Sequence, residues 1–118
     1  MNRYRVIRDY AAQYGDPIRL AAGERLTLSD RTDQWEGNAE WVWRWAVAAD
    51  GREGWVPAEI VEPLGDGVGV ARQAYDAREL SVSADDRVVS LLALCGWHVC
   101  RATDGREGWV PSSHLQEE

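Results

Sequence analysis

The chain is 118 residues long, and its 20 acidic residues outnumber its 13 basic ones, all of them arginine, to give a net charge of -7. Neither half is basic, which excludes binding to a nucleic-acid backbone, because that requires clustered positive charge. No segment approaches the ~20 apolar residues of a membrane span, and the start of the chain lacks the apolar run of a signal peptide. We therefore expect a cytoplasmic protein with no membrane partner.

The first part of the chain reads as short strands separated by turns. Alternation of polar and apolar residues predicts strands over 5–10 and 25–28, with a polar loop over 11–17 between them. Residues 29–40 are polar and acidic and predict a long loop, which is either a solvated connection or an acidic feature that binds a partner.

The strongest strand signal is residues 41–47, in which Trp41, Trp43 and Trp45 alternate and should share one side. This strand leads into Asp50–Pro57, where Asp-Gly is typical of a tight hairpin and the proline ends the following strand. The pairing across this hairpin stays open. A two-residue turn places Ala46 opposite residue 55, and a three-residue turn places it opposite residue 56.

The eight residues 50–57 return letter for letter at 104–111, which indicates two copies of one small unit. Residues 62–70, rich in glycine, read as a short linker between the copies. The predicted domains are therefore 1–64 and 65–118. Each has a size at which a domain folds only marginally and has no room for an extensive buried catalytic cavity.

The second copy repeats the order of the first, with strands expected over 71–77, 87–94 and 97–102. Indels in the loops align Asp9 with Asp76, and Leu20 with Val82. Helical periodicity is missing throughout the sequence. The fold class is therefore all-β, with two small five-stranded barrels in tandem joined by a short linker.

These motifs resemble Src-homology 3 (SH3) domains in tandem. The family pattern combines a first strand ending in Tyr-Asp-Tyr, a central strand with paired tryptophans, and a closing Gly-x-Val-Pro-Ser-x-Tyr segment. The first copy offers Val6–Tyr10, Trp43–Ala46 and Gly54–Val61, and the second offers Gln73–Ala77, Glu79–Val82, Gly96–Cys100 and Gly108–Leu115.

The resemblance implies a non-enzymatic module that binds proteins or peptides, including proline-rich ones, in an aromatic groove. A ligand arginine would dock beside an acidic loop residue and a tryptophan. Each groove has lost tyrosines that the family uses, because Arg8 and Ile60 replace two in the first copy and Ala77 and His114 replace two in the second. The implied ligand-binding residues are Tyr10, Asp16, Trp43, Trp55, Pro57 and Ile60 in the first copy, and Tyr75, Glu79, Trp97, Trp109, Pro111 and His114 in the second.

Two other functions remain open from the sequence. The acidic charge fits a small inhibitor or immunity-type protein that covers a basic surface, and the tryptophans could instead pack the units or a homodimer together, which would occlude the grooves. We expect no cofactor and no metal, because Cys95, His98, Cys100 and His114 match no zinc spacing. Both cysteines are expected as free thiols, with Cys100 at a small core position.

Overall fold

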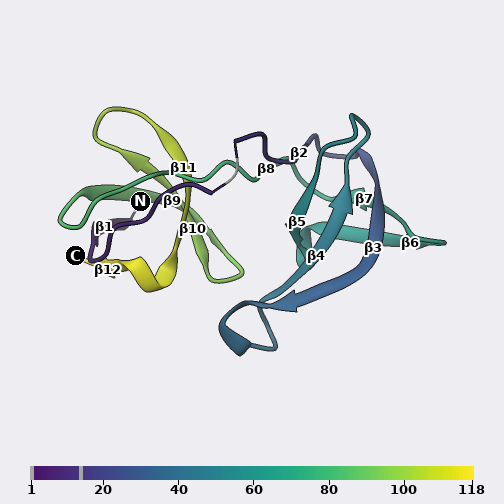
Figure 1. Cartoon of the computed structure of the whole chain (residues 1–118), viewed down its shortest axis with the longest axis horizontal. Helices are drawn as coiled ribbons and strands as arrows, with labels where there is room; N and C mark the ends of the chain where they lie inside the picture. Colours follow the sequence, from purple (N-terminus) through teal and green to yellow (C-terminus); the bar gives the residue numbers. More distant parts are fainter. Residues whose placement is uncertain (1, 14) are drawn as a thin grey trace. The chain divides into compact units, whose positions relative to one another are not determined.

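The computed structural model describes residues 2–13 and 15–118, and within them the regular elements are β-strands and short 3-10 helices (Figure 1). This confirms the all-β prediction. None of these described residues lies in a helix long and apolar enough to cross a membrane. The strands are β1 (Asn2–Val6), β2 (Arg19–Leu20), β3 (Arg25–Gln34), β4 (Val42–Val47), β5 (Glu53–Pro57), β6 (Val61–Gly65), β7 (Val68–Ala71), β8 (Tyr75–Asp76), β9 (Arg87–Leu94), β10 (Trp97–Ala102), β11 (Glu107–Pro111) and β12 (Leu115–Glu117), and the 3-10 helices are η1 (Trp35–Gly37), η2 (Ala58–Ile60) and η3 (Ser112–His114).

The strands form two compact units. Unit 1 comprises Met1–Gly15 and Arg78–Glu118, and unit 2 comprises Asp16–Ala77. The predicted division at residues 64 and 65 follows the repeat along the sequence, whereas the compact units group the residues differently. The start of the chain packs with the second copy, and the start of the second copy packs with the first.

Unit 2 contains a five-stranded sheet in the order β5-β4-β3-β7-β6 and a small ladder of β2 with β8. Alternate residues of β3 face the core, because Leu26 and Leu28 are buried while Thr27 between them is exposed. Ala46 of β4 and Val56 of β5 are buried beside them. The apolar alternation that predicted these strands thus also builds the core.

Residues 62–70 form a hairpin in unit 2 and do not act as a linker. The strands β6 and β7 are antiparallel neighbours that pair Gly65 with Val68. Asp66 and Gly67 at the turn both have positive φ, 56° and 74°, as a type I′ turn requires. A tight turn closes this hairpin at little entropic cost, so β7 pairs with the strand just before it in the chain.

Unit 1 repeats the arrangement with a strand from the other end of the chain. Its sheet has the order β11-β10-β9-β1-β12, so β1 lies between β9 and β12 (Figure 1). Arg5 of β1 pairs with Arg87 on one side and with Gln116 on the other. Val6 is fully buried in a core with residues of the second copy, namely Leu80, Val82, Val88, Cys100, Val110 and Leu115.

The two sheets match strand for strand, which shows that the first strands have been exchanged. In unit 2, β7 lies between β3 and β6. In unit 1, β1 fills the same place, between β9 and β12. Tyr10 bridges to Val82, and Tyr75 pairs with Leu20. Because Leu20 and Val82 are equivalent, so are Tyr10 and Tyr75. The alignment of Asp9 with Asp76 was therefore wrong by two residues.

Three further expectations differ from the structure. The strand β3 continues to Gln34 through an irregularity after Leu28, so only the later part of 29–40 lies outside a strand. The strand expected over 5–10 is β1 at Asn2–Val6, and Tyr10 forms only an isolated bridge. The hairpin pairs Ala46 with Gly54, and neither predicted register was correct, because its turn spans residues 48–52.

Candidate functional site

Unit 1 brings three aromatic side chains from distant parts of the chain together. The ring of Tyr10 packs edge-on against Trp97 at a centroid distance of 5.7 Å and against His114 at 5.3 Å. Trp97 lies opposite Pro111 in the ladder of β10 with β11, and Pro111 is buried. We call Tyr10, Trp97 and His114 the unit 1 aromatic cluster. Its tyrosine comes from the first copy and its other two members from the second.

Backbone pairing fixes Tyr10 in this cluster. The amide of Tyr10 donates to the carbonyl of Val82 at 2.9 Å, and the amide of Val82 donates back to Tyr10 at the same distance. Further along, the amide of Ala12 donates to Ser81 Oγ at 3.0 Å. The amide of Gln13 donates to Glu79 Oε1 at 2.8 Å. Glu79 was expected to bind a ligand arginine, and it already accepts a hydrogen bond from the backbone of the segment that follows Tyr10.

The equivalent residues of unit 2 are more apolar. Trp43 lies opposite Pro57 in the ladder of β4 with β5, and Ile60 is buried where unit 1 has His114. The hydroxyl of Tyr75 donates to the carbonyl of Trp55 at 3.3 Å, which ties the tyrosine to β5. Tyr75 is therefore a neighbour of Trp55, although it was expected to share a groove with Trp97.

Two of the tryptophans that were expected to bind a ligand are largely covered. Trp43 and Trp97 each expose only 8% of their surface. In unit 1, Tyr10 and His114 pack on each other and remain half-buried, so they offer more surface than Trp97. Tyr10 and His114 are therefore the more accessible members of this cluster.

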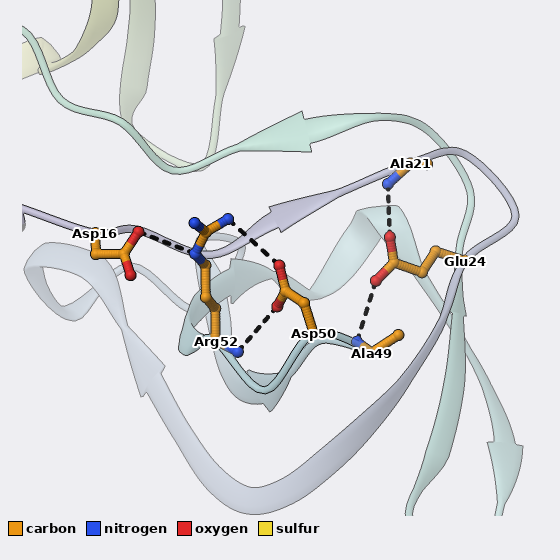
Figure 2. Close-up of polar contacts among 6 residues, drawn as sticks. All are labelled: Asp16, Ala21, Glu24, Ala49, Asp50 and Arg52. Atoms are coloured by element: carbon orange, nitrogen blue, oxygen red, sulfur yellow. Dashed lines mark hydrogen bonds and ion pairs between the residues drawn. The ribbon is translucent and has the colours of Figure 1, made fainter.

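The acidic residue expected in the unit 2 groove is paired within the chain. Figure 2 shows the Arg52 guanidinium between two carboxylates, with Nε 2.9 Å from Asp16 Oδ1 and Nη1 3.3 Å from Asp50 Oδ2. Nearby, Glu24 accepts from the amides of Ala21 at 3.0 Å and Ala49 at 3.2 Å. A ligand arginine would have to compete with Arg52 for Asp16.

Trp55 and Trp109 occupy the same position of the repeat but different surroundings. Trp109 is buried, with its amide and carbonyl bonded to the backbone of Arg78 and Leu80. Trp55 is half-buried and lies opposite Trp45, with the two rings edge-to-face at 5.3 Å. The face of the sheet that carries Trp45 and Trp55 points away from the buried Ala46 and Val56.

His98 and both cysteines of unit 1 lie in partly or fully buried surroundings. His98 Nδ1 lies 2.8 Å from Ser90 Oγ, and the ring packs on Tyr4 at 4.9 Å. Burial lowers the pKa of His98 below 6.5 and raises the pKa of Cys100 to about 12, which favours the neutral form of both. Cys95 and Cys100 are free and buried. Within residues 2–13 and 15–118, no group of three His, Cys, Asp or Glu could hold a metal ion.

Two sheets of this strand order, each with a tryptophan opposite the proline of a Gly-Trp-Val-Pro strand, define a tandem of SH3-type domains. The family model described as variant SH3 domain matches residues 3–64 and 71–118, so the chain belongs to this family. Domains of the family generally mediate protein–protein interaction and are typically non-enzymatic. The two matches correspond to the two copies along the sequence. In the structure, β1 and β7 each join the sheet of the other copy.

Proposed function

We propose that the chain is a protein-interaction module whose unit 1 aromatic cluster binds an extended, proline-containing segment of a partner protein. The observation that carries the proposal is the packing of Tyr10 against both Trp97 and His114 beside the buried Pro111. A polyproline II segment is already extended, so it loses little entropy when it lies on such a surface. Unit 2 should bind such a segment more weakly, because Ile60 stands in place of the third ring and Asp16 is already paired with Arg52.

We also propose a reducing, cytoplasmic setting, which the two free and buried cysteines support.

The experiment is a titration of the whole chain, labelled with 15N at its indoles, with a panel of synthetic peptides that carry a Pro-x-x-P sequence and one arginine. Binding should shift the indole signal of Trp97 saturably. Tyr10→Ala should weaken binding by about tenfold or more, since an aromatic hot-spot residue contributes roughly 2 kcal/mol.

Tyr75→Ala is the matched control, because it removes the equivalent tyrosine from unit 2 and should leave the affinity of unit 1 unchanged. His114→Ala is a second variant that avoids the core and should also weaken binding. The proposal fails if no peptide shifts Trp97, or if Tyr75→Ala weakens binding as much as Tyr10→Ala.

A further inference from the structure

Unit 2 carries an aromatic pair that already holds a cation. The guanidinium carbon of Arg31 lies 4.5 Å from the ring centroid of Trp45 and 5.3 Å from that of Trp55. Both rings are half-buried, while Arg31 is exposed. A guanidinium within about 6 Å of an indole face is attracted by the ring quadrupole, and here two rings attract the same group.

The two rings are held in place without Arg31. Trp45 and Trp55 lie directly opposite each other in the ladder of β4 with β5. The indole Nε1 of Trp45 donates to Glu53 Oε1 at 2.9 Å, which fixes the ring and places a carboxylate beside it. The pair therefore presents a preformed surface with negative charge at its edge, and such a surface favours a cation.

Arg31 reaches the rings from an irregular part of the sheet. It lies in β3 between Leu28 and Thr32, where the pairing with β4 shifts. Its amide donates to Ser29 Oγ at 3.1 Å, and Ser29 Oγ donates to the carbonyl of Trp45 at 3.0 Å. Its backbone is thus attached through Ser29, while its guanidinium rests on the rings.

The fold does not require this pair. In unit 1 the equivalent ladder places Val99 opposite Trp109 and Leu92 opposite Val99. Val99 takes the position of Trp45, the apolar Leu92 lies on its other side, and Trp109 is buried. The same sheet therefore forms without a cation and without a second indole.

We propose that the Trp45–Trp55 pair is a binding site for an arginine side chain of a partner protein, and that Arg31 occupies the site until the partner replaces it. The net charge of -7 favours a basic partner segment. The site belongs to unit 2 and does not depend on the unit 1 aromatic cluster, so either proposal can fail without the other.

The test compares Arg31→Ala with Arg25→Ala, which removes the same charge from the same strand, in the whole chain. The probe is N-acetylarginine amide, with N-acetylcitrulline amide as the neutral analogue, at constant ionic strength. The indole signals of Trp45 and Trp55 should shift with the arginine probe. Arg31→Ala should bind it about two- to fivefold more tightly than the unsubstituted chain, the factor expected from removing an exposed competing cation.

Trp45→Leu in the Arg31→Ala background should abolish the response at Trp55, and the indole of Trp109 should not respond in any variant. A purely structural role for Arg31 predicts a lower melting temperature in Arg31→Ala without tighter probe binding, and that result would overturn the proposal. An equal response to the citrulline probe, or equal affinities of Arg31→Ala and Arg25→Ala, would overturn it too.

Discussion

Gly54 and Gly108 occupy the same place in the repeated octapeptide, yet a methyl group would meet different atoms at the two positions. A Cβ on Gly108 would lie 2.7 Å from the backbone carbon of Glu79 and 2.7 Å from the backbone nitrogen of Leu80. A Cβ on Gly54 would lie 3.2 Å from the terminal Cγ2 of Ile18. Backbone cannot move aside as a side-chain methyl can, so alanine should be far more harmful at 108.

The expected magnitude follows from what holds residues 78–80 against β11. The amide of Leu80 donates to the carbonyl of Trp109, and the amide of Trp109 donates to the carbonyl of Arg78, both at 3.0 Å. Relieving the clash would break both bonds, at about 1 kcal/mol net each, and displace the buried Leu80. Gly108→Ala should therefore lower the free energy of unfolding by about 2–4 kcal/mol.

Gly54→Ala should change it by less than about 1 kcal/mol, because the lower entropy of the unfolded chain offsets the small shift of Ile18. Urea unfolding followed by circular dichroism and tryptophan fluorescence measures both variants. Equal destabilisation by the two substitutions, or a tolerated Gly108→Ala, would refute the close approach of residues 79–80 to β11.

Three further predictions concern side chains whose surroundings the two units do not share. Arg52→Ala should lower the free energy of unfolding by up to about 1 kcal/mol, because it removes the exposed ion pair with Asp16. Arg106→Ala is the control and should leave the urea midpoint unchanged, because Arg106 pairs with Asp104, two residues away in the same turn. Burial lowers the pKa of His98, so below pH 6.5 the unfolded chain binds more protons than the folded one. The contribution of His98 to the free energy of unfolding is complete above pH 6.5 and should shrink as the pH falls towards the lowered pKa. In urea unfolding across this range, the free energy of unfolding of a His98→Gln variant should therefore depend less on pH. Because the pKa of Cys100 is raised to about 12 and the thiol is buried, a disulfide-exchange reagent at pH 8 should modify it only at the rate of unfolding, and rapid modification of the native chain would contradict this.

The strands near the repeated octapeptide were predictable because their signals are local. Apolar alternation and the Asp-Gly dipeptides mark β3, β4 and β5, and the same signals mark β9, β10 and β11. Cys100 was predicted as a small core residue, and it is fully buried in the core of unit 1. The SH3 resemblance rested on these same segments, and the family match confirms it.

The exchange of first strands was not predicted, because either copy of the first strand can complete either sheet. Both arrangements satisfy the same alternation, so the composition of β1 and β7 does not decide between them. One local signal was present in the sequence. Asp66-Gly67 is the same dipeptide that marks the two recognised hairpins, and it closes β6 onto β7. Residues 62–70 were predicted to be a linker, and the hairpin that they form was therefore missed.

The surroundings of the repeated residues could not be predicted either, since identical sequences meet different neighbours. Glu53 accepts a hydrogen bond from the indole of Trp45, whereas Glu107 pairs with Arg101 at 2.9 Å. Such differences depend on which side chains the neighbouring strand brings into reach, and the repeated octapeptide itself does not contain that information. The composition of the two grooves, with Tyr10 beside Trp97, depends on the exchanged strands in the same way.

The most direct test of the exchanged arrangement is the set of nuclear Overhauser effects from the methyl groups of Val6 in the methyl-labelled chain. The structure places Val6 opposite Leu115 and in one core with Val88 and Val110, so cross-peaks to these residues of the second copy are expected. Cross-peaks from Val6 to Val56 and Val61 of the first copy instead would contradict the exchange, and with it the aromatic cluster of Tyr10 and Trp97.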